Sequence, residues 1–230
     1  MNLYAFTPTL ASNIQSYSRK YQLGLTVLTS PANPLAGLII LGDGTPDDLV
    51  VTIISHHLNG SNTVGIVKPP GKTGTSTFDL IRSYITYNNT LKTIVLIIDG
   101  EENNKKCIYD ELEKSLKKQK IEVEITESQN EDRFRLYDCI FDRRFKLALV
   151  INGRDDLLCQ KHTVEDHLLL MASELKLMNL PEEVIDDPKK LWLSLSEESK
   201  EKVFRELSAH RKLIEDNFPQ QIQGLNYLKP

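Results

Sequence analysis

The chain contains few cysteines, and none is placed as a member of a metal-binding pair or a disulfide framework. Its 230 residues include three, Cys107, Cys139 and Cys159. They are odd in number and far apart, and none forms a CxxC pair, so neither a disulfide-rich fold nor a zinc ribbon is indicated. A reducing cytoplasm is the simplest setting for such a chain.

Long apolar runs and an excess of basic residues are missing as well. No apolar run approaches the ~18 residues that a membrane helix needs, and the N-terminal stretch MNLYAFTPTLASNIQ lacks the charged and apolar regions of a signal peptide. The net charge is −4 and the isoelectric point is about 5.8. We therefore expect a soluble cytoplasmic protein without a membrane partner. Contact with nucleic acid would need a local basic patch or metal ions.

Short apolar runs alternate with segments of helical periodicity through most of the chain. Strands followed by helices predict βαβ units and a mostly parallel sheet with both faces covered. The first 34 residues suggest one or two strands and a turn. The expected strands cover 38–41, 62–67, 93–98, 121–126 and 146–151, and the expected helices cover 46–58, 76–87, 105–119 and 163–178. The fold class is therefore α/β, a mostly parallel, Rossmann-like sheet flanked by helices.

The end of the chain has a different composition from the rest. From Leu180 onward it is highly charged and helical in pattern, and it contains the single tryptophan, Trp192. We expect an α/β domain over residues 1–177, with its core at about 36–177. Residues 178–230 would form a C-terminal helical extension, with Trp192 packed against the main body.

Acidic residues follow three of the expected strands directly or open the helices behind them. In open parallel sheets, ligands bind outside the carboxyl ends of the strands, so these acids should meet at one edge. They are Asp43, Asp47, Asp48, Asp99, Glu101, Glu102, Asp155, Asp156, Glu165 and Asp166.

A cluster of carboxylates repels itself unless a hard cation binds to it, and Mg²⁺ (or Mn²⁺) prefers oxygen ligands. Asp99 and Glu101, separated by Gly100, could face one metal from a single loop. Such a metal would neutralise a phosphate and activate a water or hydroxyl. The alternative is structural, because acids are common at helix N-termini, where they complement the helix dipole. That explanation is sufficient for Asp47, Asp48, Glu165 or Asp166 taken singly.

The order of the motifs resembles the Toprim fold, the catalytic domain of topoisomerases, bacterial-type primases and OLD-family nucleases. A strand leads into GDGTPDD and a helix, a second strand leads into IDGEE and a helix, and a later strand is followed by TVEDHLLL. The chain is most similar to a stand-alone archaeal and bacterial Toprim-like family of unknown function. The resemblance covers about residues 36–177.

The resemblance implies roles for individual acids. Asp43 stands where the family has the glutamate of EGxxD, and Asp47 or Asp48 matches the aspartate of that motif. Asp99 matches the first acid of DxD, Glu101 replaces the second, and Glu165 matches the acid of the last motif. By this resemblance Asp43 would act as general acid or base, and the other acids would hold Mg²⁺.

This chain departs from the family pattern at three positions. Asp43 is one methylene shorter than glutamate, which removes about 1.5 Å of reach. Asn152 and Gly153 stand where the family usually has a proline after its last core strand. His162 stands where the family usually has a glycine before the last motif.

Four basic residues are candidates for contact with substrate phosphate. Lys68 and Lys72 flank Pro69-Pro70 in a segment that lacks the spacing of a phosphate-binding P-loop. Arg143 and Arg144 belong to 133–146, where basic and aromatic residues are interleaved as in single-strand binders. The alternative is that the aromatic residues of 133–146 feed the core while its charges face solvent.

These observations favour Mg²⁺-dependent phosphoryl transfer on nucleic acid, most plausibly strand cleavage, with Asp43, Asp99, Glu101 and Glu165 as catalytic residues. Asp99, Glu101, Asp47, Asp48 and Glu165 are the candidate metal ligands. Two alternatives stay open. One is a catalytically degenerate Toprim domain that binds nucleic acid or protein, and the other is a phosphohydrolase acting on small nucleotides.

Overall fold

The predicted α/β class is confirmed by a computed structural model. It describes residues 1–30, 34–58, 60, 62–102, 104–129 and 133–229. Within these residues, seven strands form one sheet in the order β1-β3-β2-β4-β7-β6-β5. The strands are β1 (Asn2–Ala5), β2 (Gly37–Leu41), β3 (Thr63–Val67), β4 (Thr93–Asp99), β5 (Glu122–Gln129), β6 (Phe134–Phe141) and β7 (Arg143–Asn152). The five strands from β1 to β7 in that order pair in parallel, whereas β6 and β5 are antiparallel.

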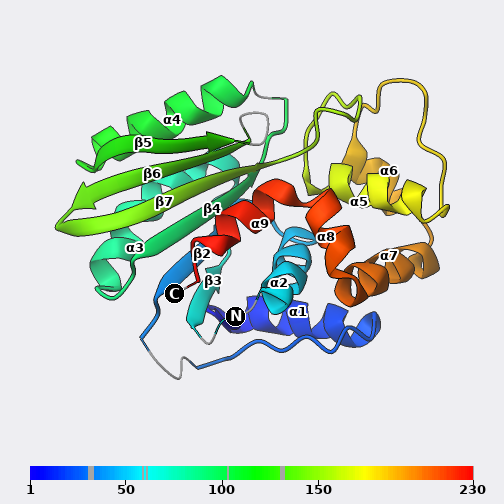
Figure 1. The fold of residues 1–230 in the computed structure, drawn as a ribbon, viewed down its shortest axis with the longest axis horizontal. Helices are drawn as coiled ribbons and strands as arrows, with labels where there is room; N and C mark the ends of the chain where they lie inside the picture. The colour runs from blue at the N-terminus through cyan, green and yellow to red at the C-terminus, as the bar shows by residue number, and fades with distance from the viewer. Residues whose placement is uncertain (31–33, 59, 61, 103, 130–132, 230) are drawn as a thin grey trace.

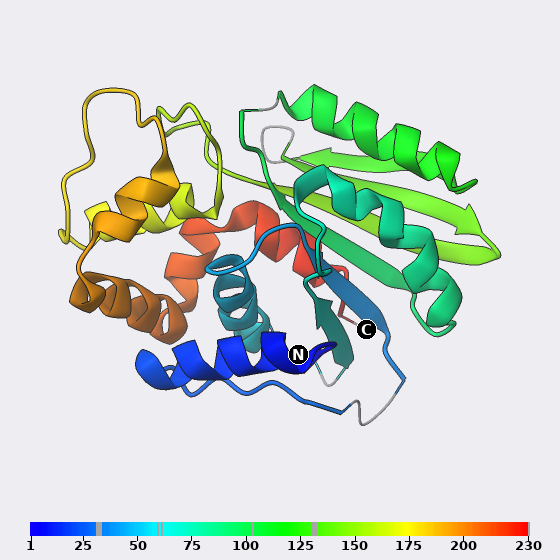
Figure 2. The same cartoon turned by 180° about the vertical axis from the view of Figure 1, so that it is seen from behind.

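Helices cover both faces of this sheet (Figures 1 and 2). The 3₁₀ helix η1, α3 and α4 pack on one face, and α1, α2, α5, α7, α8 and α9 contribute to the core on the other. The helices are α1 (Pro8–Lys20), α2 (Asp47–His57), η1 (Gly74–Leu80), α3 (Ile81–Tyr87), α4 (Lys105–Lys118), α5 (Val164–Glu174), α6 (Pro188–Ser194), α7 (Glu197–Ala209), α8 (Arg211–Asn217) and α9 (Pro219–Asn226).

The central strands are buried on both sides because their side chains alternate between the two helical layers. In β2, Leu38 and Ile40 face the layer of α3 and α4, whereas Ile39 and Leu41 face the other layer. A strand with two buried faces is apolar throughout, which explains the continuous apolar runs of β2 and β4. None of the helices in the described residues is long and apolar enough to cross a membrane.

The first part of the chain differs from the expectation of strands alone. After β1 it forms α1, which begins at Pro8 and is capped by Thr7, whose Oγ1 accepts a hydrogen bond of 3.3 Å from the Leu10 N–H. Leu10 and Ile14 bury one face of this helix against the sheet layer. Five serines and threonines surround the few apolar positions of 7–18, so the helical period is weak in the sequence.

The basic and aromatic stretch 133–146 forms β6 and the start of β7. Phe134, Tyr137 and Phe145 are buried in the two cores, while Asp138 and Arg144 point to the solvent side. The stretch therefore has the arrangement of the alternative explanation, in which the aromatic residues feed the core. Its strand β6 has antiparallel neighbours on both sides, which the expectation of a mostly parallel sheet did not include.

The C-terminal helices belong to the same hydrophobic core as the α/β layers. Helix α9 lies across β4 and β7, where Gly224 leaves so little space that a Cβ atom would overlap Val150. Phe204 of α7 stacks on Tyr21 and meets Trp192 edge to face. Trp192 is buried, as expected, and the apolar residues of the expected C-terminal extension join the core formed by α1, α2, α5 and the sheet.

Candidate functional site

The site lies at the carboxyl ends of β2, β4 and β7, which are neighbours in the sheet. The turn after β2 is held close to β4 because the Gly42 N–H donates to Ile97 O at 2.8 Å. A Cβ atom on Gly42 would overlap Ile98, so glycine permits this close approach. The turn leads into α2, whose first residue is Asp47. Helix α5 also starts at this edge, and Glu165 lies in its first turn.

Asn152 connects two of the acids. Its Nδ2 donates to Asp47 Oδ1 at 2.7 Å and to Asp99 Oδ1 at 3.0 Å, and its side chain has no exposed surface. Asp99 and Asn152 are the last paired residues of β4 and β7, so the strand register places them side by side. The Val164 N–H at the start of α5 also donates to Asp99 Oδ1, at 3.2 Å. Three distant segments therefore meet at Asp99.

We call Asp43, Asp47, Asp99 and Glu165 the acid cluster, because their negative charges act on one another. Burial, followed by the charge of Asp99, raises the pKa of Glu165 to about 7. Burial and the charge of Asp43 raise the pKa of Asp99. Burial, Asp99 and Glu165 together raise the pKa of Asp47 well above its ordinary value. Such shifts are common where carboxylates share a functional site, although structural networks cause them as well.

Lys189 supplies the positive charge nearest to these acids. Its Nζ lies 2.8 Å from Asp99 Oδ2 and 3.0 Å from Glu101 Oε1. Partial burial alone would lower the pKa of Lys189, but the two ion pairs raise it above its ordinary value. Lys189 lies in α6, in the part of the chain that the sequence analysis had not connected with the site.

Glu101 is held by its backbone in an unusual conformation. Its φ angle of 48° lies in the left-handed region, which costs a residue with a side chain roughly 1–2 kcal/mol. Two hydrogen bonds with His162 maintain it: the Glu101 N–H donates to His162 O at 2.8 Å, and the His162 N–H donates to Glu101 O at 3.0 Å. This fixes the backbone of Glu101 beside the cluster, while its side chain stays 41% exposed.

Asp48 is adjacent to Asp47, and its charge contributes to the raised pKa of Asp47, but its side chain is held by local hydrogen bonds. Its Oδ1 accepts from the Leu49 N–H at 2.8 Å, and its Oδ2 accepts from Thr45 Oγ1 at 3.2 Å. Burial raises the pKa of Asp48, while these two bonds and the charge of Lys68 oppose the rise. Asp48 therefore has the role of an acid at a helix N-terminus, and Asp47 is the residue of the pair that faces the other acids.

The two lysines proposed for phosphate contact lie on the loop after β3, at the same edge. Lys68 Nζ lies against Gly44, so that a Cβ atom there would overlap it, and its charge acts on Asp48. Lys72 is two residues before Gly74, whose N–H donates to Gly42 O at 3.0 Å. The loop is thereby attached to the turn that carries Asp43.

The two arginines proposed for the same role lie at the other end of the sheet. Arg143 and Arg144 begin β7, whereas Asn152 ends it, so about 25–30 Å of strand separates them from the acid cluster. Arg143 Nη2 donates to the carbonyls of Ile85 and Asn88 at 2.9 and 2.7 Å and so closes the end of α3. Arg143 and Arg144 therefore lie too far away to contact a phosphate bound at the acid cluster.

The remaining acids of this edge are engaged in structural contacts. Partial burial would raise the pKa of Asp155, but hydrogen bonds from Lys105 and Arg133 lower it to about 2. Asp156 pairs with Arg154 at 2.6 Å. Asp166 Oδ1 accepts from the Thr163 N–H at 3.2 Å, and its Oδ2 contacts His162 Nδ1 at 2.8 Å.

A buried polar layer supports Asn152 from behind. Gln221 Nε2 donates to Asn152 Oδ1 at 2.8 Å, so all of the polar atoms of Asn152 are used. His167 Nδ1 lies 2.6 Å from Asn217 O, and its Nε2 accepts from the Gly153 N–H at 3.2 Å. These contacts assign the proton to Nδ1, and burial lowers the pKa of His167 to about 3, so the ring is neutral. This layer fixes the orientation of the Asn152 amide.

The acid cluster fits a hard divalent cation in the chemistry of its donors. Across the described chain, no three His, Cys, Asp or Glu side chains are arranged to hold a metal ion as they stand. However, Glu165 is 4% exposed and its Oε2 is buried without a hydrogen-bond partner. A buried carboxylate oxygen without a partner is costly, and a cation would satisfy it. The neighbouring carboxylates also supply the oxygen ligands that such a cation prefers.

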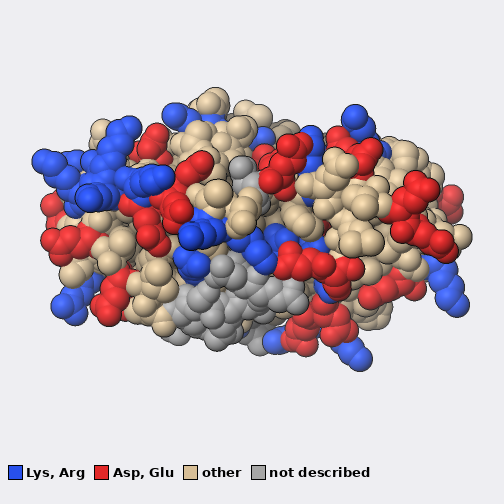
Figure 3. All heavy atoms as spheres, turned by 90° about the horizontal axis from the view of Figure 1, so that it is seen from above, with Lys and Arg blue, Asp and Glu red and all other residues tan. Residues whose placement is uncertain are grey.

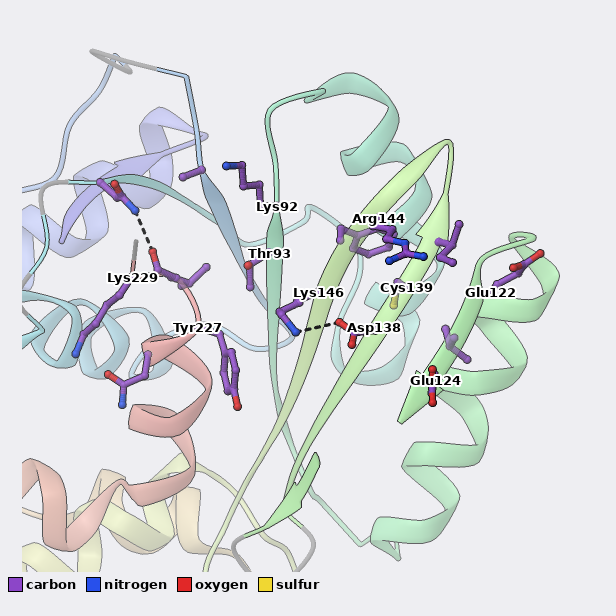
Figure 4. A pocket seen from close by; sticks show the side chains of 17 residues that line it. Lys92, Thr93, Glu122, Glu124, Asp138, Cys139, Arg144, Lys146, Tyr227 and Lys229 are labelled. Atoms are coloured by element: carbon purple, nitrogen blue, oxygen red, sulfur yellow. Dashed lines mark hydrogen bonds and ion pairs between the residues drawn. The ribbon is translucent and has the colours of Figure 1, made fainter. Parts of the chain in front are cut away.

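Figure 3 shows both signs of charge on one face, with Lys and Arg most concentrated over α4, where Lys106, Lys114, Lys117 and Lys118 are exposed. A hollow of about 1140 Å³ lies between the open face of β7, β6 and β5 and the end of α9 (Figure 4). Lys92, Arg144, Lys146 and Asp138 line it, at the amino ends of the parallel strands, so it is separate from the acid cluster.

Fold and site define this chain as an α/β protein with a mixed seven-stranded sheet and buried acids at the carboxyl edge of its parallel strands. Comparison with protein-family models, with curated proteins and with solved structures gives no match. The Toprim resemblance therefore stays a prediction.

The contacts of Asn152, Lys189 and Gln221 at the site were not predicted from the sequence. Asn152 could have been found, because it follows the strand 146–151 as directly as Asp43 and Asp99 follow theirs. Only acids were considered at strand ends, and the amide was therefore passed over. Lys189 and Gln221 have no comparable signal, since they reach the site through the packing of α6 and α9.

Proposed function

We propose that this protein catalyses Mg²⁺-dependent phosphoryl transfer on nucleic acid, with hydrolysis of a phosphodiester bond at the acid cluster. The observation that carries the proposal is the convergence of buried carboxylates from separate segments, with Glu165 Oε2 lacking any partner. The Toprim resemblance implies the same class of reaction. Lys68 and Lys72 add positive charge on the loop beside the cluster.

Asp99, Glu165 and Asp47 would hold the ion, and Glu101 would join them from the neighbouring turn. When bound, a divalent ion neutralises phosphate charge and lowers the pKa of a water. Asp43 is only partly buried, and it lies on the turn after β2, where it can accept the proton of an attacking water. Asn152 positions Asp47 and Asp99 by donating one hydrogen bond to each. Lys68 would attract the phosphate backbone of a substrate towards this edge.

The test is incubation with labelled single- and double-stranded DNA and RNA, in Mg²⁺ or Mn²⁺ and in EDTA. We expect metal-dependent cleavage by the wild type and a loss of about a hundredfold or more in Asp99→Asn and Asp47→Asn. The matched control is Asp156→Asn, which removes an exposed acid from the same edge that pairs with the largely buried Arg154. It should retain the wild-type rate.

One observation favours a second candidate, a binding module without catalysis. Lys189 already neutralises Asp99 and Glu101, so part of the cluster is satisfied without a metal. Metal binding without cleavage of any nucleic acid would support this candidate against the first. Hydrolysis of free nucleotides with no cleavage of polymers would instead indicate a small-nucleotide phosphohydrolase.

A further inference from the structure

The ammonium group of Lys189 contacts two of the acids that are expected to bind metal. Its Nζ contacts Asp99 Oδ2 at 2.8 Å and Glu101 Oε1 at 3.0 Å. The other oxygen of Asp99 accepts hydrogen bonds from Asn152 and Val164, so Oδ2 is the atom of Asp99 that a metal would use. The ammonium group and a divalent ion therefore require the same oxygen.

We propose that Lys189 is an internal counter-ion that closes the acid cluster in the metal-free protein and leaves Asp99 when a divalent cation binds. The inference rests on the proposed function, in that it assumes a divalent ion binds at this cluster. It concerns regulation of access to the site and assigns Lys189 no role in the chemistry.

Electrostatics make the two states exclusive. A lysine ammonium and a divalent ion at the same oxygen would be a few ångströms apart, and their repulsion is strong where water is largely excluded. Either cation alone offsets the repulsion between Asp99 and its neighbours. Exchange of one for the other keeps Asp99 neutralised, so the burial of Asp99 beside the other acids is compensated before a metal binds.

The Lys189 side chain can leave Asp99 without movement of helix α6. Helix α6 is fixed by Asp187, whose Oδ1 accepts from the Lys190 N–H at 3.2 Å, and by buried Trp192. The Lys189 side chain is 37% exposed, so its flexible stem reaches solvent through rotation of its own bonds. Glu101, which is 41% exposed, lies on this open side.

The first test compares Lys189→Gln with Lys190→Gln in full-length protein by calorimetric titration with Mn²⁺ alone. Both changes remove one positive charge from α6, but Lys190 is 84% exposed and lies outside the cluster. We expect Lys189→Gln to bind Mn²⁺ about tenfold more tightly than the wild type, because no ammonium has to be displaced. Lys190→Gln should stay within about twofold of the wild type.

The second test uses the wild type and does not depend on the folding of a variant. Lysines are acetylated briefly in EDTA or in saturating Mn²⁺, and the modified positions are quantified by mass spectrometry. Lys189 should be protected in EDTA and should react several times faster in Mn²⁺, whereas Lys190 should react equally in both. Unchanged Lys189 reactivity in saturating Mn²⁺ would overturn the inference.

Asp99→Asn separates the failure of this inference from the failure of the proposed function. If the wild type binds Mn²⁺, Asp99→Asn does not, and Lys189→Gln binds no more tightly than the wild type, the counter-ion proposal is wrong and the metal site stands. If neither the wild type nor Lys189→Gln binds Mn²⁺, the metal site itself fails, and the inference fails with it.

Discussion

Both ends of the sheet contain charged residues, but these residues are buried at one end and exposed at the other. At the carboxyl ends of the parallel strands, Asp47, Asp99 and Glu165 are each 3–4% exposed. At the amino ends, Asp138 pairs with Lys146 at 3.0 Å, and their side chains are 51% and 45% exposed. Water solvates the second group of charges, whereas the protein itself must compensate the first.

This difference shows why the carboxyl end is the candidate site. Burial removes the water that would screen like charges, so carboxylates there raise one another's pKa values. Two specific partners compensate the buried charge of Asp99: Asn152 of β7 and Lys189 of α6. The hollow at the amino end has a large volume but no buried charge that lacks a partner among the groups described there.

Removal of the amide of Asn152 should have the largest effect on stability. Asn152→Leu keeps the approximate volume but leaves Asp47, Asp99 and Gln221 without their shared partner. We expect a loss of about 4 kcal/mol in the free energy of unfolding at pH 8, because a buried charge that loses its donor is costly. Urea denaturation measures the loss as a shift of the midpoint.

The control for Asn152→Leu is Asn226→Leu, the same chemical change at an exposed position near the opposite end of the sheet. It should alter stability by no more than about 0.5 kcal/mol. Equal losses in the two variants would contradict the view that burial separates the two ends.

Replacement of Glu165 should change the pH dependence of stability. The pKa of Glu165 is raised from 4.5 to about 7 in the folded protein. Its stabilising contribution is therefore complete below about pH 4.5 and is lost as the pH rises through about 7. Relative to the wild type, Glu165→Gln should gain about 2 kcal/mol between pH 4.5 and pH 8. Denaturation curves at several pH values give this difference.

Glu198→Gln is the matched control, since Glu198 also lies in the first turn of a helix but is exposed. Its stability relative to the wild type should vary with pH by less than about 0.5 kcal/mol. A flat difference for Glu165→Gln as well would mean that Glu165 is solvated in solution.

Asp155 lies at the same edge as the acid cluster but should respond to pH in the opposite direction. Hydrogen bonds from Lys105 and Arg133 lower its pKa from 3.8 to about 2, against the effect of burial. Its contribution is present above about pH 3.8 and is lost as the pH falls through about 2. Because its side chain is 33% exposed, we expect Asp155→Asn to cost only about 1 kcal/mol at pH 7. A cost that persists at pH 2 would show that the charge is not its cause.

The smallest effect is expected at the amino end of the sheet. Asp138→Asn breaks the exposed pair with Lys146 and should cost less than about 0.5 kcal/mol. Raising the salt concentration to 1 M should remove most of that cost, because exposed charges are screened. Thermal unfolding in low and high salt provides the measurement. A cost above about 2 kcal/mol would show that this end is as sensitive as the carboxyl end.

Local patterns allowed the central part of the fold to be predicted. The apolar runs at 38–41, 93–98 and 146–151 became β2, β4 and β7, and the rule that parallel strands present their carboxyl ends together grouped Asp43, Asp99 and Glu165 correctly in one region. Helix α1 and strand β6 were missed because their apolar positions are interrupted by polar or charged residues. Their burial comes from partners elsewhere in the chain.

Local patterns could not predict the different environments of adjacent residues. Asp47 and Asp48 have the same side chain and share one helical turn, and only the rotation of α2 against the sheet directs Asp47 to Asn152 and Asp48 to Thr45. The basic stretch 133–146 shows the converse, because its arginines are near in sequence and far apart in space. Arg143 and Arg144 lie at the far end of β7, whereas Arg133 donates to Asn152 O at the site edge.

By itself, the sequence determined the α/β class, the central strands and the edge at which the acids gather, because periodicity and strand direction are local properties of the chain. The tertiary structure alone decided which acids are buried together, which amide orients them and which lysine neutralises them. These arrangements depend on contacts between residues far apart in sequence, such as Lys189 with Asp99. Such contacts become strong only when the packing of the helices removes water from them.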